Sequence, residues 1–292
     1  MDATNLTTAD GRTLQVLDTG GAGLACVYHG GTPSGAVVDP LAVRASADAG
    51  LRWITYSRPG YGDSTPLPGR DVASAAGDVE AILDHLDIES FVTYGLSGGG
   101  PHALATAALL SARCLGAASI GGVAPDTEPG LDFLDGMAED NVEEFRRARS
   151  GEGDLVDFLT AAEVEFAHVS GAQVVAALGG LVGPPDQAVL TGEVGAYFAS
   201  SFREALRSGI AGWRDDDLAF VRPWGFALAD MTVPVAIWQG EQDLMVPPAH
   251  GRWLAAHIPG ARAHLRPEHG HLSLGVANLP VILTDLLDHA RA

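Results

Sequence analysis

Short apolar runs alternate with helical patterns along most of the chain, and the runs usually end in Gly, Pro or Ser. Such runs are typical of strands buried on both faces of a parallel sheet. An antiparallel hairpin precedes them, because Leu6–Gly20 alternates polar and apolar residues around Asp10-Gly11. We predict strands at Leu24–His29, Arg52–Ser57, Phe91–Gly95, Leu115–Gly121, Val233–Gln239 and Ala261–Leu265, and helices at Val37–Ala49, Val72–Leu86, Gly99–Ser111, Pro248–Ile258 and Val276–Arg291. This alternation predicts a doubly wound, mostly parallel α/β sheet with right-handed crossovers.

One long segment interrupts the alternation. From about Pro125 to Asp230 the sequence has no convincing core strand, and acidic, Ala-rich helical segments take its place at Asp132–Arg149, Asp154–Val169 and Ala196–Ser208. A helical insertion of this size between two strands is typical of a cap or lid. We therefore predict a core domain formed by residues 1–124 and 231–292, with a helical cap over residues 125–230.

Charge and hydropathy narrow the classes of partner. The chain has 292 residues and a formal net charge of −20, which disfavours binding to nucleic acid and to anionic membranes. No apolar run approaches the roughly 18 residues of a membrane span, and the first residues resemble no secretory signal. We expect a cytoplasmic protein that acts on a small-molecule substrate; a homodimer is left open. Cys26 and Cys114 are expected to be small buried hydrophobic residues.

The segment Gly95-Leu96-Ser97-Gly98-Gly99 follows a predicted strand and precedes a predicted helix. This GxSxG pattern is typical of a sharp strand-to-helix turn that exposes the serine hydroxyl. The flanking glycines avoid a Cβ clash, and the N-terminus of the next helix directs N–H groups toward the serine. We predict that Ser97 is a nucleophile.

A serine nucleophile needs a base, and the base needs an orienting carboxylate. His271 lies between the last predicted strand and the last predicted helix and is our candidate base, with His269 as its local rival. Asp243 follows the strand Val233–Gln239 and is our candidate acid; Glu241 and Asp126 are its rivals. The chain order of serine, aspartate and histidine is that of a nucleophile-elbow enzyme.

The developing oxyanion needs two N–H donors. The first expected donor is the amide of Gly98, and the second is that of Thr32 or, failing that, of Gly31. Thr32 and Gly31 both lie in the loop His29-Gly30-Gly31-Thr32-Pro33, where His29 is expected to brace the loop. Residues expected to contact substrate are His29, Tyr197, Trp213 and Trp224.

Five ordered segments carry a family resemblance: His29–Pro33, Ser57–Ser64, Gly95–Gly99, Gly240–Asp243 and Gly270–Leu272. On these the chain resembles the α/β-hydrolase superfamily over nearly its whole length. The resemblance implies an eight-stranded, mostly parallel sheet, a helical cap between the sixth and seventh strands, and no cofactor. It also implies that Asp63 stabilises the loop beside the site.

We predict a serine hydrolase of small ester or acyl substrates that forms an acyl-enzyme. Relatives of this fold that cleave haloalkanes or epoxides use an aspartate nucleophile, which Ser97 argues against. Three further activities would keep the same triad: a proline iminopeptidase-like aminopeptidase, a carbon–carbon bond hydrolase and a perhydrolase. A non-catalytic ligand-binding homologue is also left open. For an aminopeptidase, the cap acids that could hold a substrate amine are Glu163, Glu165, Glu193 and Glu204. No metal site is expected, because Asp215-Asp216-Asp217 is interpreted as a solvated helix start.

Overall fold

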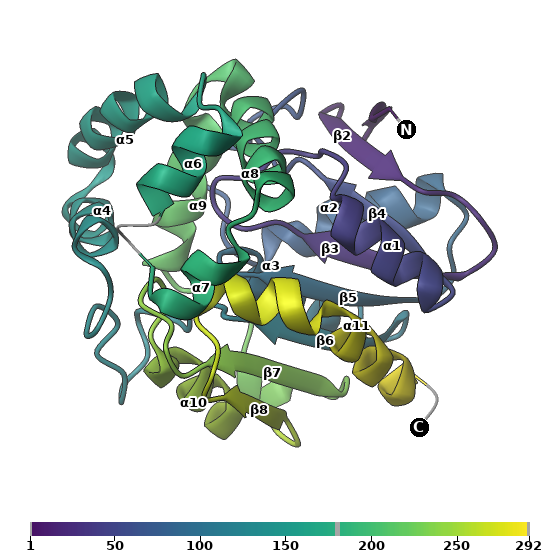
Figure 1. Ribbon diagram of the computed structural model, residues 1–292. Coiled ribbons are helices and arrows are strands. Elements are labelled where there is room, and N and C mark those ends of the chain that lie inside the picture. The colour runs from purple at the N-terminus through teal and green to yellow at the C-terminus, as the bar shows by residue number, and fades with distance from the viewer. Residues whose placement is uncertain (1, 179–181, 291–292) are drawn as a thin grey trace.

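The computed structural model describes residues 2–178 and 182–290, and its centre is a single twisted sheet (Figure 1). Over these residues the sheet has eight strands in the order β1-β2-β4-β3-β5-β6-β7-β8. Strands β1 and β2 are antiparallel to their neighbours, and the others pair in parallel. The strands are β1 (Thr4–Thr7), β2 (Thr13–Asp18), β3 (Leu24–His29), β4 (Leu51–Tyr56), β5 (Phe91–Leu96), β6 (Cys114–Ile120), β7 (Val235–Gly240) and β8 (Arg262–Arg266). The predicted fold class is confirmed.

The two faces of the sheet support separate apolar cores. Neighbouring residues of one strand enter different cores, as Trp53 and Ile54 of β4 do, because successive side chains point to opposite faces. One face is covered by α1 (Pro40–Asp48) and α11 (His271–Ala290), and the other by α2 (Ser74–His85), α3 (Gly99–Leu109) and α10 (Pro248–His257). Burial on both faces explains why the strands are continuously apolar in the sequence. Cys26 and Cys114 are buried in these cores, as expected.

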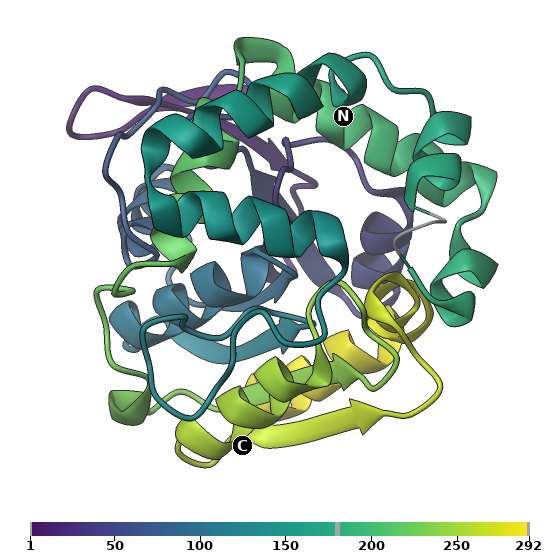
Figure 2. The same cartoon turned by 90° about the vertical axis from the view of Figure 1, so that its left-hand side faces the viewer.

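Helices α4 to α9 connect β6 to β7 and gather at the end of the sheet where the parallel strands finish (Figures 1 and 2). They are α4 (Glu139–Ser150), α5 (Glu152–Phe166), α6 (Gly171–Leu178), α7 (Pro184–Val189), α8 (Gly192–Ala205) and α9 (Ala211–Phe220), with 3₁₀ turns η1 (Leu206–Ser208) and η2 (Leu228–Asp230). Two apolar clusters hold these helices together, and one of them includes Leu272 of α11. The division of the chain at residues 125 and 230 into core and cap stays a prediction.

The last helix differs from its predicted start. The pattern places the start at Val276, but α11 begins at His271. Its first turn is fixed by a side chain from another helix, because the carboxylate of Asp186 in α7 accepts hydrogen bonds from the backbone N–H groups of His271 and Ser273. A capping residue so distant in the chain leaves no local signal, and the predicted start is therefore wrong.

Candidate active site

Ser97 occupies the turn between β5 and α3 with φ at 55°, a left-handed value rare for a residue with a Cβ. The glycines on either side allow this turn to fit. A Cβ at Gly95 would lie 2.0 Å from the carbonyl oxygen of Gly99, and a Cβ at Gly99 would lie 2.0 Å from that of His29. The turn is tied to the sheet by the Ser97 N–H, which donates to the Ile120 carbonyl at 2.9 Å. Sequence and geometry therefore agree on a strained, glycine-dependent elbow.

His271 and Asp243 meet at the end of β6, where a Cβ at Gly121 would lie 3.1 Å from the Nδ1 atom of His271. The Nδ1 atom of His271 lies 2.7 Å from Oδ2 of Asp243, and both residues are buried. The other carboxylate oxygen of Asp243 accepts hydrogen bonds from the backbone N–H groups of Met245 and Val246 at 2.9 and 2.8 Å. These bonds fix the carboxylate, and a carboxylate bonded to Nδ1 leaves Nε2 as the imidazole atom available to accept a proton.

Neighbouring negative charge raises the pKa of His271. Burial disfavours the charged imidazole, but the charge and hydrogen bond of Asp243, with a smaller contribution from the charge of Asp186, outweigh burial and raise the pKa of His271 above its usual value. A raised pKa makes the imidazole a stronger base, which suits removal of a proton from a hydroxyl group.

The rival residues have other partners. The imidazole of His269 lies 3.2 Å from the side-chain nitrogen of Asn278. Glu241 forms an ion pair with Arg252, and Asp126 forms one with Arg149. The structure therefore brings together His271 and Asp243, and it does not bring their rivals into the same contact.

The loop after β3 lies against the serine turn. A Cβ at Gly31 would lie 3.5 Å from the Ser97 Cβ, and one at Gly98 would lie 2.3 Å from the Thr32 hydroxyl oxygen. The backbone N–H groups of Thr32 and Gly98 donate to no protein acceptor in the described part of the chain. Two available N–H groups from two segments therefore lie in the residues next to Ser97, the arrangement that an oxyanion hole requires.

Arg58 and Asp216 hold that loop in place. The guanidinium of Arg58 donates to the carbonyl oxygens of Gly30 and Gly31 at 2.6 and 2.8 Å. The Asp216 carboxylate accepts from the Thr32 hydroxyl at 2.8 Å and lies 2.5 Å from the Arg58 guanidinium. This buried cluster fixes the backbone that would present the second oxyanion donor.

The acidic run of α9 is buried, which corrects the interpretation of Asp215-Asp216-Asp217 as a solvated helix start. The three side chains are 3%, 0% and 1% exposed. Asp216 also pairs with Arg70 at 2.6 Å and accepts from the Tyr61 hydroxyl at 2.8 Å. Although burial alone would raise its pKa, the charges of Arg58 and Arg70 hold it well below the usual value. The basic partners lie far away in the chain, so the local pattern did not reveal them.

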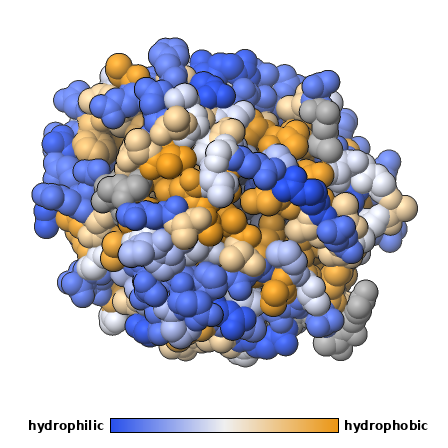
Figure 3. All heavy atoms as spheres, in the orientation of Figure 1, coloured by the Kyte–Doolittle hydropathy of each residue, from blue (hydrophilic) through white to orange (hydrophobic). Residues whose placement is uncertain are grey.

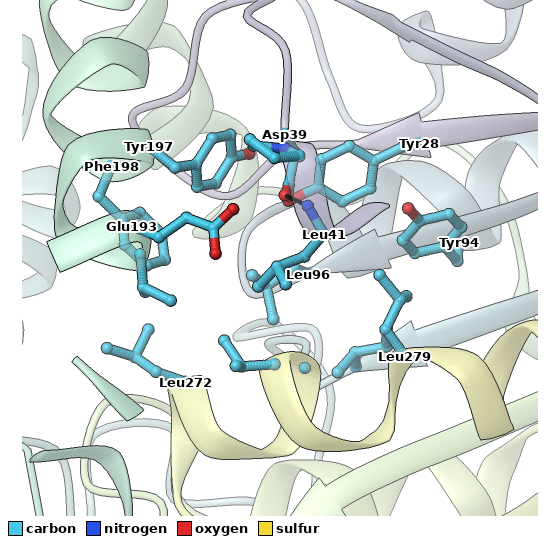
Figure 4. Close-up of a pocket in the computed structure, with 15 residues that line it drawn as sticks. Tyr28, Asp39, Leu41, Tyr94, Leu96, Glu193, Tyr197, Phe198, Leu272 and Leu279 are labelled. Carbon is cyan, nitrogen blue, oxygen red and sulfur yellow. Dashed lines mark hydrogen bonds between the residues drawn. The ribbon is translucent and has the colours of Figure 1, made fainter. Parts of the chain in front are cut away.

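Ser97 and His271 line the same central cavity, together with Thr32 and Tyr197. A neighbouring pocket, here called the apolar branch, shares Tyr197 and other side chains with that cavity. Figure 4 shows Tyr197 and Phe198 of α8 facing the strand residues Tyr28 and Tyr94 across it, above Leu272 and Leu279 of α11. Apolar side chains are also exposed in the middle of this face of the molecule (Figure 3). The apolar branch can accept a hydrocarbon group.

Three of the four residues expected to contact substrate lie outside the cavities around Ser97 as the structure describes them. His29 is completely buried beside Tyr56 and His102, and Trp224 is buried in the core against Phe226. Trp213 is buried as well, and its indole N–H donates to Glu144. None of the three lines the cavities around Ser97 among the described residues, whereas Tyr197 does. A side chain at the end of a strand, or an aromatic side chain in the segment between β6 and β7, can face the core as readily as it can face a pocket.

A second pocket adjoins Ser97, Gly98 and Thr32 and is here called the acidic branch, because Glu144 of α4 and Asp217 of α9 line it. The sequence did not single out Glu144, which is one of several acids in a polar helix. The cap acids proposed as amine ligands lie elsewhere: Glu193 lines the apolar branch, and Glu163, Glu165 and Glu204 line none of these three cavities as the structure describes them.

Comparisons with known proteins identify the fold family. A family model described as the alpha/beta hydrolase fold matches residues 26–277. The uncharacterised hydrolase YcgS of Bacillus subtilis is 37% identical over 94 residues, which is 32% of each chain. The non-heme chloroperoxidase of Streptomyces lividans is 33% identical over 151 residues, or 49% of this chain and 53% of that protein. The matches thus span a third to about half of these relatives' own lengths.

A solved structure extends the likeness to the whole chain. The thermophilic esterase from Thermogutta terrifontis has a TM-score of 0.67 and 20% identity, and the match covers 100% of both chains. At this level of identity the likeness shows the fold alone. In the described residues, no helix is both long and apolar enough to cross a membrane.

Proposed function

Because the chain belongs to the alpha/beta hydrolase fold family, we propose that it is a serine hydrolase of small esters that acts through Ser97, His271 and Asp243. The observation that carries this proposal is the 2.7 Å contact between His271 and Asp243, with Ser97 at a φ of 55° lining the same cavity as His271. Names of relatives add support, since one curated relative is called a hydrolase and one structural neighbour an esterase.

In the proposed acylation, Oγ of Ser97 attacks the ester carbonyl carbon while Nε2 of His271 takes the hydroxyl proton. The carbonyl oxygen becomes an alkoxide, which the N–H groups of Gly98 and Thr32 stabilise. When the alkoxide collapses, the bond to the alcohol oxygen breaks and His271 returns its proton to that oxygen. Asp243 keeps the imidazole oriented and stabilises its charged form throughout.

Deacylation repeats these roles with water. His271 takes a proton from a water molecule as its oxygen attacks the acyl carbon, and the same N–H groups stabilise the second alkoxide. Collapse then breaks the bond to Ser97 Oγ, which recovers its proton from His271, and the carboxylic acid leaves. No cofactor is required by these steps.

The two pockets suggest where the two halves of the ester bind. The leaving alcohol must lie near His271, which protonates it, and His271 lines the central cavity that joins the apolar branch. The acidic branch also borders Ser97, Gly98 and Thr32, but His271 is not among its lining residues as the structure describes them. We therefore place the alcohol part of the ester toward the apolar branch and the acyl part toward the acidic branch.

Labelling with a fluorophosphonate probe tests the nucleophile. Wild type is expected to be labelled and to hydrolyse short aryl esters, Ser97→Ala is expected to do neither, and the exposed Ser111→Ala serves as the matched control with wild-type behaviour. An unlabelled wild type would favour a non-catalytic binding protein. Undiminished labelling of Ser97→Ala would assign the reactive group to another residue.

A perhydrolase is the second candidate, and the similarity to a non-heme chloroperoxidase over 151 residues favours it. In that reaction hydrogen peroxide replaces water in the attack on the acyl-enzyme and a peracid leaves. Measuring peracid against carboxylic acid formation at fixed peroxide separates the two candidates. Turnover of a proline arylamide would reveal an aminopeptidase, and turnover of a carbon–carbon bond substrate would reveal a carbon–carbon bond hydrolase.

A further inference from the structure

The acidic branch contains a pair of carboxyl groups with no basic partner along the cavity wall. Glu144 comes from α4 and Asp217 from α9, and both line this cavity, close enough for each to influence the pKa of the other. Two carboxyl groups can share a hydrogen bond only when one of them holds a proton. No Lys, Arg or His belongs to the lining within the residues that the structure describes.

The proton belongs on Asp217. Burial raises the pKa of both acids, and the charge of Glu144 with that of Asp216 raises the pKa of Asp217 further, well above its usual value. Glu144 is in addition stabilised as an anion by the Trp213 indole N–H, which donates to it at 2.7 Å. The pair therefore carries one negative charge, held mainly on Glu144.

This pair can accept a further hydrogen bond. Asp217 is 1% exposed, and its Oδ2 atom receives no N–H or hydroxyl hydrogen bond from the chain as described. Asn141, on the same wall, uses its amide nitrogen to bond the Met245 carbonyl, which leaves its oxygen as an acceptor. Apart from Ser97 and Thr32, the polar side chains of the lining are those of Asn141, Glu144 and Asp217, and Phe145 and Phe220 supply apolar walls.

We propose that the acidic branch binds a protonated amine on the acyl part of the substrate, so that the preferred substrates are esters of amino acids with apolar alcohols. A charged ammonium group donates three hydrogen bonds and compensates the partly buried anion, whereas a neutral alkyl group leaves that charge uncompensated. This inference rests on the proposed serine hydrolase, which fixes the acyl group on this side of Ser97. It extends that function by naming a substrate class.

The test compares two pairs of isosteric esters. Benzyl esters of β-alanine and of butanoic acid differ only by ammonium in place of methyl, and those of glycine and propanoic acid differ in the same way. Wild type is expected to favour the ammonium member of at least one pair by about tenfold or more in kcat/KM, as expected for a charge-assisted hydrogen bond. A wild type without this preference would overturn the proposal.

Two substitutions separate charge from structure. Glu144→Gln removes the anion and is expected to lose the preference for ammonium. Asp217→Asn keeps a hydrogen-bond donor facing Glu144 and is expected to retain it. Asp157→Asn, at an exposed acid of α5 outside the cavity, is the matched control and should match wild type on all four esters. Retention of the ammonium preference by Glu144→Gln would contradict the proposal, as would its equal loss in both acid variants.

Two measurements distinguish failure of the amine site from failure of the proposed hydrolase. Fluorophosphonate labelling of each variant reports the state of Ser97 independently of the ester ratio. Normal labelling without an ammonium preference overturns the acidic branch as an amine site and leaves the hydrolase standing. A wild type that neither labels nor hydrolyses any of the esters overturns both. In Ser97→Ala, calorimetric binding of the β-alanine ester more tightly than the butanoate ester would support the amine site without turnover.

Discussion

The backbone N–H of His271 donates a hydrogen bond to Oδ2 of Asp186 at 2.8 Å. Asp186 is completely buried, and its other oxygen accepts from the N–H and the hydroxyl of Ser273 at 2.8 and 2.7 Å. Gly270 is required here, because a Cβ on it would lie 2.4 Å from the same carboxylate. Helix α7 thus fixes the first turn of α11, where the proposed catalytic base lies.

Replacing this carboxylate should impair both folding and catalysis. Asp186→Ala removes the acceptor for three donors, and each buried donor left unpaired costs about 1–3 kcal/mol, so we expect a marked loss in the free energy of unfolding measured with urea. Among molecules that remain folded, kcat should fall more than KM rises, because the imidazole is displaced. Asp157→Asn, at an exposed acid on α5, should change neither quantity.

Asp186→Asn distinguishes a positioning role from a purely structural one. The amide retains an acceptor oxygen but removes a negative charge that contributes to the raised pKa of His271. The acidic limb of the kcat/KM profile should therefore move to lower pH. An unchanged limb together with an unchanged kcat would show that Asp186 serves only to stabilise the helix.

The pH profile of the wild type follows from His271. A general base must be neutral, so kcat/KM should fall as pH drops through the pKa of His271, which is raised above its ordinary value of 6.5. Asp243→Asn removes the main cause of the raised pKa. In this variant the acidic limb of the kcat/KM profile should lie at lower pH. Its kcat should be reduced by about 10³–10⁴, because no carboxylate holds His271 in the tautomer with a proton on Nδ1. A limb unaffected by Asp243→Asn would assign the titration to another group.

The ion cluster of Arg58, Arg70 and Asp216, which holds the loop after β3, should contribute strongly to stability. Asp216→Ala leaves the buried guanidinium groups of Arg58 and Arg70 without their carboxylate, and breaking a buried pair in this way costs about 3–5 kcal/mol. Glu193→Gln, which breaks the exposed pair with Arg44, should cost about 0–1 kcal/mol. Equal losses in urea unfolding would contradict the structural ranking.

The same cluster has a definite dependence on pH. The pKa of Asp216 is well below its unfolded value of 3.8, so its contribution is present above that value and is lost as pH falls through the folded pKa. The difference in unfolding free energy between wild type and Asp216→Ala should therefore be constant near neutral pH. It should narrow only under strongly acidic conditions.

The parts of the site that the sequence predicted are those encoded by short local patterns. Backbone strain and burial act on neighbouring residues in the chain. The sequence therefore predicts the strand before Ser97, the glycines around Ser97 and the strand that precedes Asp243. The rest depends on side chains distant in the sequence. Asp216 is buried because Arg58 and Arg70 reach it from another loop, and the partner of Glu144 is supplied by a different helix.

For a similar reason, the sequence did not show which buried aromatic residues line a pocket. Tyr197 lines the cavities around Ser97 and Trp213 lines none of the three described, although both lie in helices between β6 and β7. Helical periodicity identifies the buried face of a helix, but it does not distinguish a face packed on protein from one that borders a pocket. That distinction requires the positions of the neighbouring helices.

The apolar branch offers a final test of how the ester is oriented. Gly275 of α11 lines it, and a Cβ there would make ordinary contact with Leu96 at 3.6 Å, so a larger side chain narrows the pocket without a backbone clash. Gly275→Val should leave hydrolysis of ethyl esters nearly unchanged and reduce kcat/KM for octyl esters by about tenfold or more, since an apolar pocket discriminates strongly by size. Gly77→Val in α2, at an exposed position with no neighbour within 4 Å, is the matched control. If Gly275→Val discriminates by the length of the acyl chain and not by that of the alcohol, the two halves of the ester bind in the opposite orientation, and the amine site must then recognise the alcohol.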